Sequence, residues 1–128
     1  MNRISLFVVA LVCVLSPDVH AGSRDDGFAK AMAIYAQRAE VTKHVEAVSA
    51  FSELAKAHPS DREVQFWCAR TASYAAHRIF DTKVKQKIAG RGVKCAQRML
   101  DSDPTDYDGR LWWILCRLRY ESGRNPID

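Results

Sequence analysis

The sequence has few residues that interrupt helices and no pattern typical of β-strands. Past residue 21, proline occurs only at positions 59, 104 and 126, and no stretch alternates between apolar and polar residues. The intervals between these prolines are rich in alanine, leucine, lysine and arginine, which favour helices. These features predict an all-α protein.

Residue patterns typical of enzymes are also missing. His44, His58 and His77 have no serine or carboxylate at a recognised catalytic spacing. The segment GRG at 90–92 lacks the spacing of a phosphate-binding loop and has no strand before it. We therefore expect a non-enzymatic protein without a cofactor.

Metal-binding patterns fail as well. The three cysteines after residue 21, at positions 68, 95 and 116, include no CxxC pair. The acidic stretch that begins at Asp101 resembles a calcium loop in composition. Its sixth position is an aspartate where that loop needs glycine, and its twelfth is a tryptophan where the loop needs glutamate. No metal site is predicted.

The chain begins with a segment that resembles a secretory signal. Arg3 precedes an apolar run from Ile4 to Leu15, whose 12 residues are fewer than the roughly 20 of a transmembrane helix. Val19 and Ala21 suit a signal peptidase, so we predict cleavage after Ala21 and one domain over residues 22–128. The expected location is periplasmic or extracellular, and a membrane-anchored, cytosol-facing protein is the alternative.

An exported chain with three cysteines leaves at least one of them unpaired or paired with another chain. If the chain turns near Thr82, Cys68 and Cys95 lie at the same height in a helix hairpin, and a turn near Thr105 brings Cys95 level with Cys116. One disulfide through Cys95 can form if the paired Cα atoms lie within about 7 Å. Because free cysteine also packs as a small apolar residue, we expect buried free thiols.

Apolar residues recur at helical spacing in four segments, which predicts helices over about 46–59, 60–80, 81–100 and 106–122. Ser60 is expected to cap the second of these, with Glu63 completing a capping box. In the third, Gly92 lies on the apolar face, which predicts a close approach of helices and a point where this helix can break. Gly123 is the expected C-cap of the last helix.

The sequence repeats after 45 residues, because PSDREVQFW from Pro59 overlays PTDYDGRLW from Pro104. A helix terminator, an acidic first turn and a tryptophan recur in that order. The acids near Pro104 are therefore expected to serve the start of a helix, where the helix dipole favours negative charge. The pattern predicts a repeat of helix hairpins.

This order resembles the tetratricopeptide pattern, because Ala47, Phe51 and Pro59 have the spacing of its second helix, and Trp67 and Tyr74 that of its first. Over about residues 42 to 118 the chain is similar to the regulator of microtubule dynamics family. The resemblance implies about five helices in antiparallel hairpins, stacked as a short tetratricopeptide-like superhelix that binds microtubules, membranes or phospholipid. The helical-repeat component of some periplasmic transporters shares this architecture and suits the signal segment better.

A basic helix face is the first candidate binding surface. Residues 83–98 hold six basic residues and no acidic one. Five of them recur every three or four residues, and we call them the basic stripe: Lys83, Lys87, Arg91, Lys94 and Arg98. Because like charges at this spacing repel, the stripe indicates a use such as binding an acidic protein or an anionic lipid. A solvated helix face is the alternative.

Four aromatic residues form the second candidate set: Trp67, Tyr74, Trp112 and Trp113. They could line a ligand pocket or an interface, although Trp67 and Trp112 have the spacing of core residues. Trp113 points about 100° away from Trp112, so we expect it on the terminal face, exposed or shared with a second copy in a homo-oligomer.

The predicted function is a non-enzymatic scaffold that holds an acidic or extended protein partner. The contact would be the basic stripe or a groove between helices, and no nucleic acid is expected. The alternative is an exported ligand- or lipid-binding accessory protein similar to the periplasmic transporter component.

Overall fold

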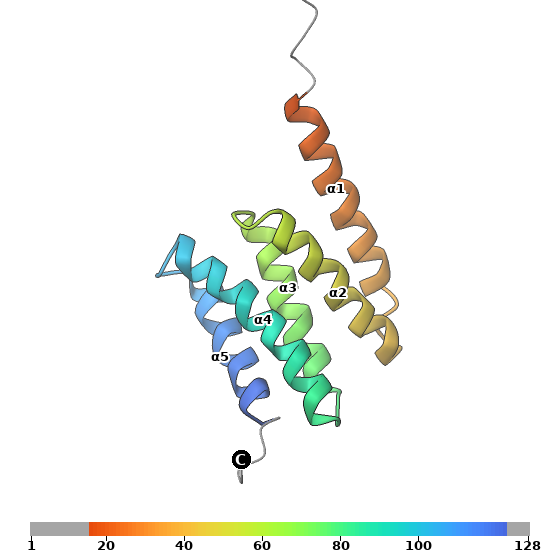
Figure 1. Cartoon of the computed structure of the whole chain (residues 1–128), viewed down its shortest axis with the longest axis vertical. Coiled ribbons are helices and arrows are strands. Elements are labelled where there is room, and N and C mark those ends of the chain that lie inside the picture. The colour runs from red at the N-terminus through yellow and green to blue at the C-terminus, as the bar shows by residue number, and fades with distance from the viewer. Residues whose placement is uncertain (1–15, 123–128) are drawn as a thin grey trace, which may run out of the picture.

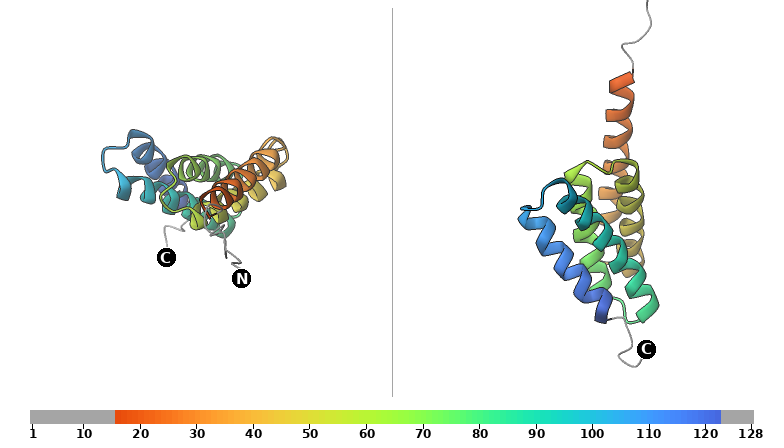
Figure 2. Two further views of the ribbon diagram at one scale, coloured as in Figure 1. Left: turned by 90° about the horizontal axis from the view of Figure 1, so that it is seen from above. Right: turned by 60° about the vertical axis from the view of Figure 1, so that its left-hand side comes forward.

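Five α-helices make up the part of the chain that the structure, a computed structural model, describes: residues 16–122, with side chains from Gly22 onward. They are α1 (Ser16–Tyr35), α2 (Val41–Ala57), α3 (Arg62–His77), α4 (Thr82–Ser102) and α5 (Tyr107–Ser122). Successive helices run antiparallel and pack on one another (Figure 1). Because α3 also packs on α5, and α2 on α4, odd and even helices form two layers (Figure 2).

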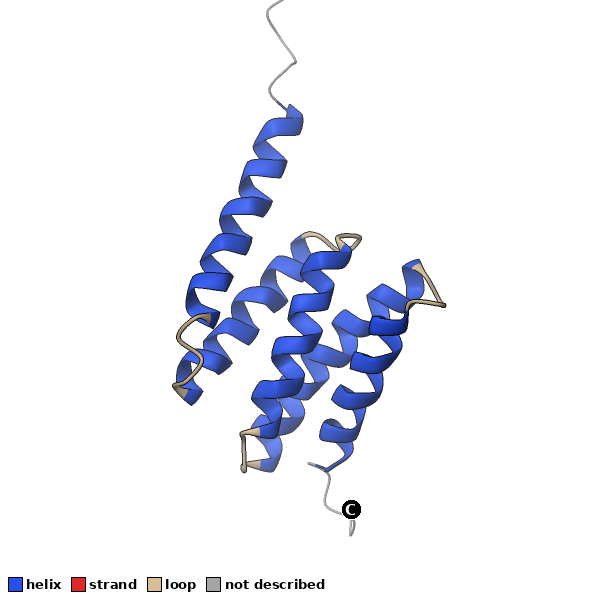
Figure 3. Cartoon of the chain, turned by 180° about the vertical axis from the view of Figure 1, so that it is seen from behind, coloured by secondary structure: helices blue, strands red, loops and turns tan. Residues whose placement is uncertain are grey.

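The predicted all-α class is confirmed, since every regular element within residues 16–122 is a helix (Figure 3). The predicted signal segment, residues 1–21, lies mostly outside the described residues, although α1 begins at Ser16, ahead of the predicted cleavage site. Among the described helices, none is long and apolar enough to cross a membrane.

Aspartates begin three of the helices. The side chains of Asp61, Asp81 and Asp106 each accept a hydrogen bond from the backbone N–H three residues on, at 3.2, 2.9 and 3.1 Å. The prediction that Ser60 caps α3 together with Glu63 is wrong. Asp61 has the extended backbone that directly precedes the first helical residue, so its carboxylate reaches the free N–H. The acid after Pro104 serves a helix start, as the repeat predicted.

One arginine connects α1 to the start of α3, and a second connects α3 to the start of α5. These arginine clamps are Arg24 with Asp61 and Glu63, and Arg62 with Asp106 and Asp108. In both clamps the arginine Nε donates to the capping aspartate, at 2.8 and 2.7 Å, and Nη2 donates to the acid two residues later, at 2.9 Å. The acids of the two clamps are 45 residues apart, the period seen in the sequence, whereas the two arginines are 38 residues apart.

We expect removal of one clamp to weaken the fold in a pH-dependent way. The Arg62 guanidinium holds the pKa of Asp106 below its usual value. A carboxyl of this kind stabilises the fold above its unfolded-state pKa of about 3.9, and that contribution is lost as the pH falls further. Asp106→Asn should therefore lower the free energy of unfolding by about 1 kcal/mol at neutral pH. In acid, the free energy of unfolding of this variant should decrease less steeply with falling pH than that of the unchanged chain, as measured by urea titration at several pH values.

Lys56→Met is the control, because it breaks an exposed ion pair with Glu53, whose atoms lie 3.0 Å apart. Such a pair contributes about 0–1 kcal/mol. If the free energy of unfolding of Asp106→Asn decreased with falling pH as steeply as that of the unchanged chain, the stabilising role of this clamp would be refuted.

α4 is one continuous helix, so the predicted break at Gly92 is absent. A Cβ atom on Gly92 would lie 2.5 Å from Cys116 Sγ on α5 and 2.9 Å from Ala72 Cβ on α3. The predicted close approach is therefore confirmed. It accounts for a glycine in mid-helix, where glycine costs about 1 kcal/mol relative to alanine.

Cys68 and Cys95 form a disulfide between α3 and α4, with Cα atoms 6.1 Å apart. The expectation of three free thiols is wrong, whereas the predicted equal height of Cys68 and Cys95 is confirmed. Cys116 stays free and buried, and its Sγ donates to the Ala69 carbonyl at 3.4 Å. Since disulfides persist in oxidising compartments, the bridge is consistent with a location outside the cytoplasm.

Candidate functional site

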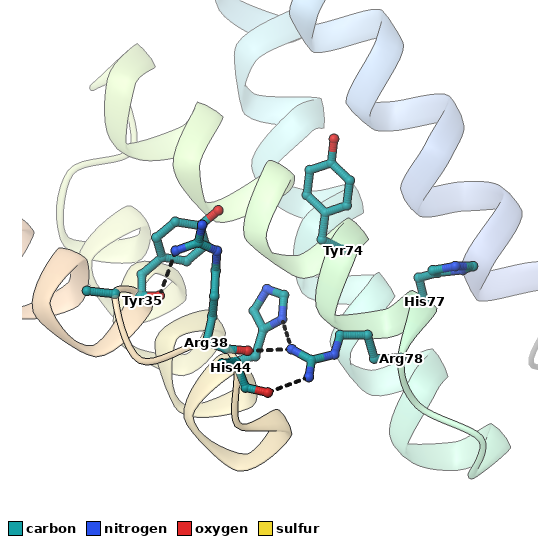
Figure 4. Close-up of a pocket in the computed structure, with 8 residues that line it drawn as sticks. Tyr35, Arg38, His44, Tyr74, His77 and Arg78 are labelled. Carbon is teal, nitrogen blue, oxygen red and sulfur yellow. Dashed lines mark hydrogen bonds between the residues drawn. The ribbon is translucent and has the colours of Figure 1, made fainter.

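A cleft of about 690 Å³ opens between the α1–α2 turn and the C-terminal end of α3 (Figure 4). Its lining residues are Tyr35, Ala36, Arg38, Ala39, His44, Tyr74, His77 and Arg78. This described lining holds two arginines, two histidines and two tyrosines, and no acidic residue. A volume of this size is typical of small-molecule sites.

Arg78 positions the two sides of the cleft. It follows the last turn of α3, and its guanidinium donates to the backbone carbonyls of Arg38 and of Ala39, the latter at 2.8 Å. The same group lies 3.1 Å from Nδ1 of His44 (Figure 4). One side chain of α3 therefore holds the α1–α2 turn in place.

Two tyrosines form aromatic walls. Tyr35 meets Trp67 and His44 edge to face, with ring centroids 5.5 and 6.0 Å apart. Tyr74 meets Trp112 edge to face at 5.7 Å, and 46% of its surface is exposed. Each tyrosine is thus supported by a tryptophan behind it while it lines the cleft.

Three arginines around the cleft contact neutral groups. The guanidinium of Arg38 lies 4.3 Å from the ring centroid of Tyr35, and that of Arg70 lies 5.1 Å from Trp67. Arg78 bonds to carbonyls and an imidazole. Across residues 22–122, no ion pair joins any of these three arginines to a carboxylate. The clamp arginines are neutralised by acids, whereas the positive charge at the cleft is not.

His44 adds a buried donor. It is 4% exposed, and burial, followed by the charges of Arg78 and Arg38, lowers its pKa, so the ring is neutral at pH 7. Because Nδ1 accepts from Arg78, we assign the proton to Nε2. Within the described chain this buried Nε2 has no hydrogen-bond partner, which is uncommon for a buried polar atom.

The basic stripe lies on α4, away from the cleft lining. Lys83, Lys87 and Lys94 are exposed. The two arginines of the stripe turn inward: Arg91 donates to Ser49 Oγ at 2.8 Å, and Arg98 donates to Gln65 Oε1 at 3.3 Å. Those two side chains contribute to packing between helices, so the outward charge of the stripe comes from its lysines.

The candidate aromatic residues separate into two groups. Trp67 and Trp112 both pack against Phe66 in the core, at centroid distances of 6.0 and 6.1 Å. Tyr74 joins them through Trp112. Trp113 is half-buried and also packs against this core, and Arg117 lies 5.8 Å from its ring centroid.

The uncovered apolar face of α5 is built from other side chains than Trp113. They are Tyr107, Leu111, Ile114 and Leu118, exposed by 77%, 36%, 52% and 62%. An exposed terminal face was predicted, but Trp113 does not form it.

Most of the cleft was missed by the sequence analysis, which identified Tyr74 alone among its lining residues. Tyr35, Arg38, His44 and Arg78 come from two turns that only folding brings together. One signal was present, because residues 69–80 contain basic and aromatic residues and no acid.

No protein-family model matches this chain, and comparisons with curated proteins and with solved structures found no match either.

Proposed function

We propose that this chain is a non-enzymatic binding scaffold of tetratricopeptide-like helix hairpins that holds an acidic, extended segment of a protein partner. The observation that carries the proposal is the uncompensated charge of Arg38, Arg70 and Arg78 around an aromatic cleft. Arginine presents a planar fork of donors that suits carboxylates. The rings of Tyr35 and Tyr74 provide contact area for apolar side chains of the same segment.

The repeated helix starts and arginine clamps support the hairpin architecture. The helix starts with their clamp acids recur after 45 residues, and the order of these sequence features resembles the regulator of microtubule dynamics family. The cleft lies where the first hairpin meets α3, so it is a groove between helices of the kind expected for such a scaffold.

An exported location is part of the proposal. The predicted signal segment and the disulfide between Cys68 and Cys95 both support it. In such a compartment the partner is an exported acidic protein, since tubulin is not present there.

A second candidate function is binding of a small anionic ligand with an apolar body. The volume of about 690 Å³ and the aromatic walls favour it. Salt distinguishes the two candidates, because contacts between charges weaken as ionic strength rises, whereas burial of an apolar body does not.

The test is binding of a labelled peptide that alternates glutamate with apolar residues, measured by fluorescence anisotropy. Arg38→Gln should raise the Kd about tenfold, because it removes a charged partner of the carboxylates. Arg38 is preferable to Arg78, whose loss would also release the α1–α2 turn.

Lys94→Gln is the matched control, because it removes one exposed charge of the basic stripe and should change the Kd less than twofold. A larger effect for Lys94→Gln than for Arg38→Gln would place binding on the stripe and refute the cleft. Failure of the peptide to bind, together with binding of an anionic aromatic dye that Arg38→Gln weakens and that salt weakens only slightly, would favour the small-ligand function.

A further inference from the structure

Phe80 is the most exposed large apolar side chain in the described chain, at 97%. It lies in the turn between α3 and α4, at the end of the molecule that is lowest in Figure 1. Val84, in the first turn of α4, is 43% exposed. Val41, which begins α2, is 40% exposed and lies at the same end (Figures 1 and 3).

Lysines surround this turn. Lys83, Lys85 and Lys87 lie in the first two turns of α4, and none of them forms an ion pair within residues 22–122. Cations at a helix N-terminus are opposed by the helix dipole. Asp81 caps α4, as Asp61 and Asp106 cap the other two helices. α4 lacks the second acid that Glu63 and Asp108 supply in the first turns of α3 and α5. Asp81 is thus one acid beside three lysines, so the start of α4 keeps a net positive charge.

Side chains in the first turn of a helix lean toward its N-terminus. The stems of Lys83 and Lys87 therefore extend toward the same end as Phe80. The exposed Phe80 ring and these lysine stems therefore belong to the same end of the molecule.

We infer that the Phe80 turn, defined as residues 78–81 with Lys83, Lys85 and Lys87, contacts an anionic lipid surface. A single protruding ring can enter the headgroup layer, while lysines extend their apolar stems and keep their ammonium groups among anionic headgroups. The charge complementarity favours this partner. A protein partner would need a preformed pocket for the ring, whereas a fluid lipid surface opens around it.

Phe80 and the three lysines do not line the cleft, although Arg78 of the same turn does. Arg78 belongs to the same turn and bonds to the α1–α2 turn, so the two turns form one end of the molecule. A chain bound through Phe80 would hold the cleft beside the lipid surface.

The test is co-sedimentation with vesicles of phosphatidylcholine, with or without about 30% phosphatidylserine. Each variant is produced from the full chain and used in its processed form, with its mass determined. Phe80→Ser should lower the partition coefficient on anionic vesicles about tenfold. Replacing one of the three lysines by glutamine should lower it about fivefold, and replacing all three should remove the preference for phosphatidylserine.

Tyr107→Ser is the matched control, because Tyr107 is 77% exposed at the start of α5, where Asp108 supplies an acid. It should change the partition coefficient less than twofold. Equal thermal midpoints would show that both serine variants remain folded. Equal losses for Phe80→Ser and Tyr107→Ser, or equal binding to neutral and anionic vesicles, would overturn the inference.

Discussion

Replacing Cys68 and Cys95 together by alanine is expected to lower the free energy of unfolding by about 3–4 kcal/mol. The bridge closes a loop between residues 27 positions apart and joins two packed helices. Loop-closure entropy in the unfolded chain predicts a contribution of this size. Urea titration of the unchanged chain and the double variant, each extrapolated to zero urea with its own m-value, measures it. For a small domain this is a large share of the total stability.

Cys116 provides the control for this experiment. Burial raises the pKa of its thiol to about 12, so the thiol stays protonated and shielded. In the folded protein cleaved after Ala21, which lacks Cys13, iodoacetamide should therefore modify no cysteine, and after unfolding without reductant it should modify one. Modification of three cysteines under the latter condition would show that the disulfide does not form.

Gly92→Val is expected to have the second large effect, a loss of more than about 3 kcal/mol. A Cβ atom added at this position would lie 2.5 Å from Cys116 Sγ, and valine adds two further methyl groups in the same packed space. Gly92→Ala should cost about 1–3 kcal/mol, because α4 must move away from α3 and α5. Thermal and urea unfolding measure both changes.

Gly90 offers a matched comparison two residues away on the same helix. A Cβ there would lie 3.7 Å from Tyr120, an ordinary contact. Gly90→Ala should therefore stabilise the protein by up to about 1 kcal/mol through helix propensity. Destabilisation of similar size in Gly90→Ala and Gly92→Ala would contradict the packing argument.

Local chemistry accounts for what the sequence could predict. Helical spacing of apolar residues placed four of the five helices, and the aspartate after Pro104 was recognised as a helix start. Gly92 was identified as a contact point because it lies on an apolar face. Each of these inferences needs only neighbouring residues along the chain.

The remaining features depend on directions and distances between segments. Cys95 was predicted to lie level with both Cys68 and Cys116 along the helix hairpins, so either could be its disulfide partner. The directions of the side chains, which the sequence does not show, decide between the two. The clamps join residues 37 to 46 positions apart, as far as Arg62 from Asp108. The cleft is built from two turns, whose side chains follow no helical period. Ser60 was chosen as a cap over Asp61 because residue type alone suits both positions.

The arginine clamps and Arg78 lie at opposite ends of the stack (Figure 1). In the clamps, arginine donates to carboxylates, whereas Arg78 donates to neutral acceptors. A guanidinium forms weaker hydrogen bonds with neutral acceptors than with carboxylates. The clamped end is therefore held by the stronger contacts, and the Arg78 end by the weaker ones. An anion that takes hydrogen bonds from Arg78 withdraws them from the α1–α2 turn. Under the proposed function, one guanidinium would thus link occupancy of the cleft to the position of the α1–α2 turn.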